Sequence, residues 1–430
     1  MVFWGFLIIG ALLGLILTRR LSALASLILV PVVGSLLAGF GSRTFAFAVE
    51  GIRDIAPVVA MFVFAILFFG ILRNAGMFDP LIEAILGRVG HNPVWIAMGT
   101  AVLAMVVHLD GSGATTFLIA VPALLPLYER LGLDRRVLAC VVSLGAGIMN
   151  MMPWGGPTLR AASALEVDVA AVYRPLVLPQ LAGILFVLGI SAWLGRREGR
   201  RLAAGEGSMA PPAEPLGPVR GTASLPPRFW WNVALAVVTV ASLVAGLMAP
   251  AMVFMLATTV ALLLNHPDPS EQRRQIVEHS EAAILMTGIL LAAGVFTGIL
   301  RESGMIDAMA TAVVSVVPPG AGGHLPLIVA VLSMPLSLVF DPNSFYFGVL
   351  PVLAGTGLEF GIEPTTMAHA ALMGQMTTGF PLSPLTAATF LLIGLAKVDL
   401  ADHQRFTFGY ALAATLVMTF VAVVAGVIPV

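Results

Sequence analysis

The chain has 430 residues, of which 59% are hydrophobic and 10% are charged, and its mean hydropathy is +0.99. Soluble domains carry about 25% charged residues, so this composition excludes an ordinary soluble protein and indicates a membrane protein. The net charge of −1 gives no indication of a nucleic-acid partner, and the single cysteine, Cys140, excludes an internal disulfide and a cysteine-based metal cluster.

Apolar segments long enough to cross a bilayer, which takes roughly 20 residues, recur along the whole chain. The first segment lacks a basic leader and a clear cleavage site, so we interpret it as a span and not as a signal peptide. The predicted spans are 2–18, 21–40, 56–73, 136–165 and 174–194 in the first half, and 229–247, 250–265, 280–300, 365–396 and 406–427 in the second. We therefore expect an all-α membrane protein of about ten transmembrane helices.

Each half also contains an apolar region that polar residues interrupt, between its third and fourth spans. Region 92–130 is interrupted around Asp110, and region 324–356 is interrupted around Asp341. Non-helical backbone at membrane depth persists only inside protein or beside a wet cavity, so we expect two re-entrant hairpins. Prolines within spans 136–165 and 365–396 prevent a continuous helix, so we expect both spans to be broken helices.

The segment 195–228 is the clearest linker, because it is rich in Gly, Pro and Ala and has six Arg against three Glu. Its composition predicts a flexible loop, and its arginine excess places it in the cytoplasm. Five spans precede it, so we expect external N- and C-termini in a bacterial plasma membrane. The predicted organisation is a first repeat at 1–194, the linker at 195–228 and a second repeat at 229–430.

A short internal repeat supports that division. Gly70–Asp79 and Gly298–Asp307 are identical at seven of ten positions, and the same order of hairpin and broken span follows each copy. An odd number of spans per half would place the second half upside down relative to the first, which is the inverted-repeat plan of secondary transporters. A chance match in an apolar chain is the alternative. Arg73 and Arg301, one in each copy, are interpreted as helix-end anchors.

The polar residues of the two hairpins and two broken spans are the candidate substrate contacts. Glycines allow backbone to approach a ligand, hydroxyls donate hydrogen bonds, and a helix N-terminus at the midplane attracts anions. The candidates are Ser112, Gly113, Thr115, Thr116, Asn150, Gly155, Gly156, Thr158, Arg160, Asn343, Ser344, Gln375, Thr377, Thr378, Ser383 and Thr386.

Charged residues within these segments are functional hypotheses, because ionisable groups are costly in a membrane. Asp110 and Asp341 occupy matching hairpin positions and are candidates for coupling to a proton or another cation; the alternative is that each caps a helix N-terminus. Arg160 could clamp a carboxylate, or it could extend toward the external surface. His108 is a weaker candidate, interpreted mainly as a packed helix residue.

At these same segments the sequence resembles the citrate–metal:proton symporter (CitMHS) family of the ion transporter superfamily. The resemblance runs in order over nearly the whole chain. The matching stretches are LDGSGATTFLIAVPALLPLYERLG from 109, LGAGIMNMMPWGGPTLRAASAL from 144, FYFGVLPVLAG from 345 and DHQRFT from 402. Ser112 stands where the family usually has a second acidic residue, which leaves the substrate and metal open.

The resemblance implies uptake of citrate as a divalent-metal complex with Mg²⁺ or Ca²⁺, driven by protons, in a homodimer with an elevator mechanism. It implies no permanently bound cofactor, an organic-acid substrate and a lipid environment. The alternatives are a sodium-coupled or metal-independent transporter of another organic anion and, more remotely, a channel. No HExxH or GxSxG motif indicates an enzyme. We therefore predict a transporter that is not an enzyme.

Overall fold

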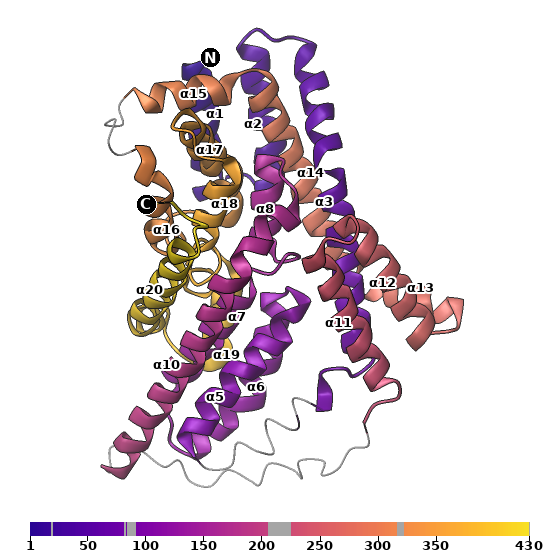
Figure 1. The fold of residues 1–430 in the computed structure, drawn as a ribbon, viewed down its shortest axis with the longest axis vertical. Helices are drawn as coiled ribbons and strands as arrows, with labels where there is room; N and C mark the ends of the chain where they lie inside the picture. Colours follow the sequence, from indigo (N-terminus) through magenta and orange to yellow (C-terminus); the bar gives the residue numbers. More distant parts are fainter. Residues whose placement is uncertain (19, 81–82, 84–91, 205–224, 316–321, 430) are drawn as a thin grey trace.

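The computed structural model describes residues 1–18, 20–80, 83, 92–204, 225–315 and 322–429. Every regular element in these ranges is helical, which confirms the predicted all-α class (Figure 1). Five helical stretches there are long and apolar enough to cross a membrane: 43–74, 93–110, 169–203, 283–302 and 400–424. Several shorter apolar helices accompany them, so the count of about ten spans stays a prediction.

Two helices that are distant in sequence share the most extensive contact among the described elements: α3 (Arg43–Asn74) and α14 (Ser280–Glu302). A Cβ added to Gly51 would lie 2.0 Å from the carbonyl oxygen of Gly294, and one added to Gly298 would lie 2.7 Å from Gly51 Cα. Small residues let the backbones touch, as they do in many membrane helix pairs. The short helices α1 (Val2–Leu17) and α2 (Ala23–Leu37) pack beside this pair.

Helix α3 is longer than the predicted span 56–73. Glu50, Arg53 and Asp54 lower the hydropathy of its first turns, but the helix continues through them and through Pro57. The charges are accommodated because Arg53 pairs with Glu50, at 3.1 Å, and Asp54 pairs with Arg301 of α14, at 2.8 Å.

The first hairpin consists of α5 (Pro93–Val107), the short helix η1 (His108–Asp110) and α6 (Gly113–Arg130). The chain turns at Gly111, whose φ of 73° is costly for residues with a Cβ. The hydroxyl of Ser112 then accepts a hydrogen bond from the Thr115 N–H and caps α6. Helix α7 (Arg135–Met149) follows, and after a break the chain resumes as α8 (Gly156–Leu165).

The second half contains the same sequence of elements. Helix α16 (Leu325–Leu336), the π-helix η4 (Ser344–Val349) and α17 (Leu350–Glu359) form the second hairpin. Helices α18 (Pro364–Leu372) and α19 (Ala387–Ala396) flank the second break, which contains the short helix η5 (Phe380–Leu382). The two hairpins lie toward opposite ends of the molecule, with the breaks between them (Figure 1).

The junctions that follow the two broken helices have the same backbone. Glu166 ends α8 and Lys397 ends α19, both in the left-handed region with φ of 54° and 55°. Two residues later, Asp168 caps α9 (Val169–Tyr173) and Asp399 caps α20 (Leu400–Val424). The same interval along the chain separates both pairs, and the inverted repeat itself stays a prediction.

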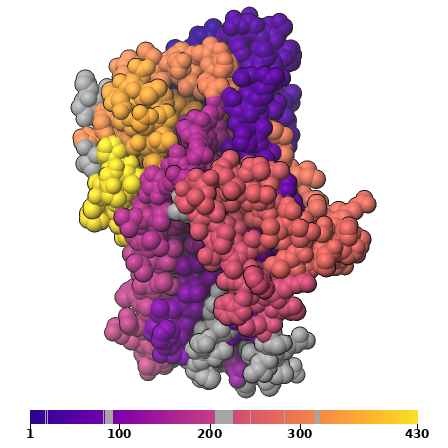
Figure 2. All heavy atoms as spheres, turned by 45° about the vertical axis from the view of Figure 1, so that its right-hand side comes forward, coloured from indigo at the N-terminus to yellow at the C-terminus, as the bar shows by residue number. Residues whose placement is uncertain are grey.

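The remaining helices connect these units. They are η2 (Arg174–Leu176), α10 (Val177–Ala203), α11 (Phe229–Ala245), α12 (Pro250–Asn265), α13 (Pro269–Glu278), α15 (Met305–Val314) and η3 (Gly322–His324). Helices α13 and α15, which lie outside the predicted spans, precede and follow α14. Helices α11 to α13 form a lobe on one side of the molecule (Figure 2).

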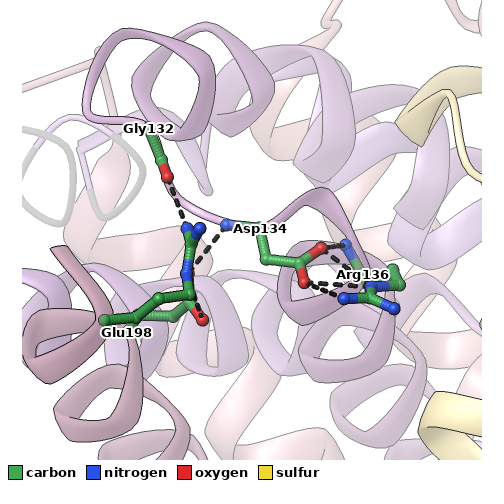
Figure 3. Close-up of polar contacts among 5 residues, drawn as sticks. Gly132, Asp134, Arg136 and Glu198 are labelled. Carbon is green, nitrogen blue, oxygen red and sulfur yellow. Dashed lines mark hydrogen bonds and ion pairs between the residues drawn. The ribbon is translucent and has the colours of Figure 1, made fainter. Parts of the chain in front are cut away.

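The predicted loop 195–228 is wrong in its first part, because α10 continues to Ala203. Arg201 donates to the carbonyl oxygen of Gly132 at 2.6 Å and pairs with Glu198 at 2.8 Å, while Glu198 accepts from the N–H of Asp134 at 2.9 Å (Figure 3). The loop between α6 and α7 therefore holds the last turns of α10 in place. Residues 205–224 of the predicted linker lie outside the described residues.

Candidate functional site

The tip of the first hairpin lines a cavity of about 520 Å³, called here cavity 1. From the predicted residues it contains Asp110, Ser112, Gly113 and Thr115. The ends of two neighbouring elements complete it, because α3 contributes Arg73, and Glu278, His279 and Glu281 come from the junction of α13 and α14. Cavity 1 thus has one arginine against three carboxylates.

Asp110 is held from two sides in cavity 1. Its carboxylate accepts the Ser112 N–H at 2.8 Å and lies 3.6 Å from the Arg73 guanidinium. Arg73 also donates to the Thr115 hydroxyl at 3.3 Å. Arg73 lies in the last turn of α3, as an anchor at the helix end would, and it is also part of the candidate site. The signal that could have identified it is the repeated Gly-Ile-Leu-Arg motif, which places an arginine at the same point in both halves.

The tip of the second hairpin lines cavity 2, of about 820 Å³. Among the predicted residues it contains Arg160, Asp341, Asn343 and Thr386. Arg20, from the loop between α1 and α2, also lines it. This cavity therefore has two arginines against one carboxylate, the opposite balance to cavity 1.

Arg160 does not extend to the external surface, because it is only 6% exposed. Its Nε donates to the Asn343 side-chain oxygen at 2.9 Å, and its Nη2 lies 3.4 Å from the sulfur of Met286, a residue that lines both cavities. The carboxylate of Asp341 accepts the N–H groups of Asn343 and Ser344 at 3.0 and 3.3 Å. Asp341 therefore caps the second arm of the hairpin and also borders the cavity.

The other predicted contacts line neither cavity, and several of them make internal hydrogen bonds. The Thr158 hydroxyl donates to Met151 O at 2.8 Å, Thr377 donates to Leu372 O at 3.0 Å, and Thr378 contacts Thr415 at 2.6 Å. The hydroxyls of Thr158 and Thr377 thus form hydrogen bonds with backbone carbonyls that the breaks would otherwise leave unpaired, and the hydroxyl of Thr378 pairs with that of Thr415. The residues outside both cavities are Thr116, Asn150, Gly155, Gly156, Thr158, Ser344, Gln375, Thr377, Thr378 and Ser383.

The glycines of these segments are explained by close protein contacts. A Cβ on Gly113 would lie 2.3 Å from the ring of Phe380, so the first hairpin tip packs directly against the second break. A Cβ on Gly155 would lie 2.1 Å from Asn150 O. A Cβ on Gly156 would lie 2.7 Å from the Arg160 guanidinium, so this glycine leaves room for that side chain.

Neither cavity resembles a permanent metal centre. No group of three or more His, Cys, Asp or Glu side chains in the described part of the chain could hold a metal ion.

Comparison with solved structures supports the fold. The chain is similar to the YdaH transporter of Alcanivorax borkumensis, with a TM-score of 0.63 and 14% identity over 90% of this chain and 89% of that one. It is also similar to MtrF of Neisseria gonorrhoeae, with a TM-score of 0.60 and 13% identity over 90% and 85% of the two chains. At such low identities the likeness concerns the fold alone.

Sequence comparison gives the family. A protein of Bacillus subtilis (strain 168) described as a citrate transporter is 43% identical over 99% of this chain and 98% of its own length. Another, described as a Mg(2+)/citrate complex secondary transporter, is 40% identical with the same coverage. The profile of the family described as Citrate transporter matches residues 6–374.

The predictions of a transporter, and of a chain that is not an enzyme, are thereby confirmed. The family and the several apolar helices also make this a multi-pass membrane protein. Since the family profile covers most of the chain, this protein belongs to the CitMHS citrate transporter family.

Proposed function

We propose that this protein is a secondary active symporter that imports citrate as a complex with a divalent cation, coupled to protons. Two relatives, at 43% and 40% identity over nearly the whole chain, are described as transporters of citrate and of the Mg(2+)/citrate complex. This similarity supports the substrate class, and the charges of the two cavities support the division of roles described below.

The observation that carries the proposal is the buried Arg160 in cavity 2, held by Asn343 and bordered by the helix-capping Asp341. A citrate trianion would bring more negative charge than one buried guanidinium can balance. A divalent metal on the citrate leaves a monoanion, which matches the surplus of one positive charge among the side chains of cavity 2. The hydroxyl of Thr386 and the N-terminus of α19 add hydrogen-bond donors at the same place.

Cavity 1 suits the coupling cation. Asp110, Glu278 and Glu281 outnumber Arg73, so a proton or another small cation is favoured there over an anion. We assign Asp110 to coupling because it lies at the hairpin tip and is almost covered, with 8% of its side chain exposed. The proposal includes a homodimer in a bacterial plasma membrane, external termini and an elevator movement of the hairpins and broken helices.

Uptake into proteoliposomes tests this function. Citrate accumulation should require Mg²⁺ or Ca²⁺ and an inward proton gradient, so EDTA should remove most of it and a protonophore should collapse it. Equal transport in EDTA would refute the metal complex. A Na⁺ requirement with indifference to the protonophore would instead favour sodium coupling. Sodium coupling is tested because Ser112 stands where the family usually has an acidic residue.

A further inference from the structure

A buried chain of hydrogen-bonded groups connects the first hairpin tip to the second break. Thr116 donates to the carbonyl oxygen of Ser112 at 2.8 Å and lies 2.8 Å from Nδ1 of His108. Nε2 of His108 lies 3.3 Å from the Asn150 side-chain oxygen, and the Asn150 amide donates to Met376 O at 2.7 Å. His108 and Thr116 are completely buried, and Asn150 is 7% exposed.

The far end of this chain is a strained residue that the second hairpin also holds. Met376 has a φ of 55°, which is unfavourable for a residue with a Cβ. Its carbonyl is held by Asn150, and its N–H donates to the Ser337 hydroxyl of the second hairpin turn at 2.9 Å. Tyr346, in the second arm of that hairpin, donates to the preceding carbonyl of Gln375 at 2.7 Å. The chain of groups therefore reaches the turn that borders cavity 2.

This chain of hydrogen-bonded groups has one hydrogen fewer than it has contacts. Both ends, the carbonyls of Ser112 and Met376, are acceptors only. Four contacts join these two ends: Ser112 O with Thr116, Thr116 with His108, His108 with Asn150, and Asn150 with Met376 O. Only three hydrogens are available for them, one from the Thr116 hydroxyl, one from the neutral imidazole and one from the Asn150 amide N–H that faces Met376. While Thr116 donates to Ser112 O, His108 donates from Nδ1 to Thr116, and the contact between Nε2 of His108 and Asn150 is the one without a hydrogen.

The contact that lacks a hydrogen can shift to the other end of the chain of groups. If Thr116 turns its hydroxyl toward Nδ1 of His108, the imidazole carries its hydrogen on Nε2 and donates to Asn150. The contact without a hydrogen is then the one between the Thr116 hydroxyl and Ser112 O, which keeps only the backbone N–H of Thr116, at 3.0 Å, on the tip that borders cavity 1. A cation or donor in that cavity that reached the second lone pair of Ser112 O would favour this second arrangement. His108 would then donate a hydrogen bond to Asn150, whose amide holds the carbonyl of Met376.

We propose that His108 is a positioning residue that couples the two cavities, so that the state of the first hairpin tip changes the affinity of cavity 2 for its anion. The inference rests on the proposed function, because it takes cavity 1 as the cation site and cavity 2 as the citrate site. Its specific content is the path, which runs through Thr116, His108, Asn150 and Met376.

The test is a double-mutant cycle on the purified full-length protein, with calorimetric titration of Mg–citrate. Asp110→Asn alters the charge of cavity 1 and should change the citrate Kd at least about fivefold in the otherwise wild-type chain, the lower end of typical site coupling. His108→Asn retains a group near Nδ1 for Thr116, and His108→Gln retains one near Nε2 for Asn150. In either background Asp110→Asn should change the Kd less than about twofold.

His403 provides the matched control. It is also completely buried and contacts a carbonyl of the second break, Pro381 O at 3.0 Å, but it lies outside the chain of groups. His403→Asn should leave the coupling factor at its wild-type value. An unchanged factor in both His108 variants overturns the inference, as does a citrate Kd that Asp110→Asn leaves unaltered.

A second readout separates this inference from the proposed function. Leu385→Cys places a thiol in cavity 2, and its rate of reaction with a soluble maleimide needs no substrate. In the Leu385→Cys protein that retains His108, Asp110→Asn should change that rate. In the Leu385→Cys protein that also carries His108→Asn, Asp110→Asn should leave the rate unchanged. If the wild-type protein does not bind Mg–citrate, the proposed function fails, while the thiol rates still support or overturn the coupling.

Discussion

The two cavities are built on the same plan with opposite charge. In each, an aspartate follows the first arm of a hairpin and accepts backbone N–H groups of the next turn, and an arginine lies nearby. In cavity 1 the arginine is about one-third exposed and carboxylates predominate, whereas in cavity 2 Arg160 is buried and arginines predominate.

This difference shows that similar backbone does not imply similar ligands. The neighbours that set the charge come from outside the hairpins: Glu278, His279 and Glu281 reach cavity 1, and Arg20 reaches cavity 2. The junctions after the broken helices show the same contrast, because Glu166 pairs with Arg301 and Lys397 pairs with Glu129 on equivalent backbone. If the two cavities differ in function as they differ in charge, substitutions in one cavity should affect citrate binding and those in the other should affect coupling.

The largest effect is expected from Arg160→Gln. Removing a buried cation that citrate would contact should weaken citrate affinity at least about 100-fold, or ~3 kcal/mol. Arg20→Gln changes the charge of the same cavity by the same amount, but Arg20 is exposed, so its effect should stay below about fivefold. Citrate titration of both variants checks this, and equal losses would indicate that only the net charge of the cavity matters.

Asp110→Asn should abolish accumulation of citrate while leaving counterflow exchange measurable, because the coupling group is lost and the anion site remains. Asp341→Asn offers the contrast. Asparagine caps a helix N-terminus about as well as aspartate, so this variant should fold, and it should alter citrate affinity more than coupling. Normal accumulation by a well-expressed Asp110→Asn protein would contradict the role assigned to cavity 1.

Arg73→Gln should have a smaller effect of opposite sign. The guanidinium lies 3.6 Å from the Asp110 carboxylate and competes with any cation that binds there. Its removal should lower the half-saturating concentration of the coupling ion about fivefold, as expected for losing ~1 kcal/mol of partly exposed repulsion. The control is Arg301→Gln, at the equivalent position of the other copy, which should leave that concentration unchanged.

The smallest effect is expected outside both cavities, at Asp134, which caps α7 and pairs with Arg136 at 2.7 Å (Figure 3). Burial acts to raise the pKa of the Asp134 carboxyl, but hydrogen bonds and the charge of Arg136 outweigh it and hold the pKa below its usual value. Its stabilisation is therefore present above the ordinary aspartate pKa of about 3.9 and is lost as pH falls through the lower folded value.

Asp134→Ala should accordingly lower the free energy of unfolding by ~1 kcal/mol at neutral pH, the usual worth of a helix cap. Thermal melts in detergent from pH 7 downward should show the difference from wild type shrinking on the acid side. Citrate affinity and coupling should both be unaffected, and a selective change in either would mean that α7 transmits strain to one cavity.

The amino-acid sequence by itself determined where the chain is apolar and where it is interrupted. Hydropathy, proline and glycine act locally, so the two turns near Asp110 and Asp341 and the two breaks could be located from residue order alone. The end of α10 could not, because residues 195–203 look like a linker until Glu198 and Arg201 meet the α6–α7 loop.

Only the tertiary structure decided which polar residues face a cavity. Asn150 and Arg160 lie in the same polar segment, yet the first is enclosed between His108 and Met376 and the second borders cavity 2. Arg73 lies far in sequence from the first hairpin and joins it only because α3 ends beside Asp110. Such contacts depend on how distant helices pack, and a pattern of neighbouring residues carries no record of that packing.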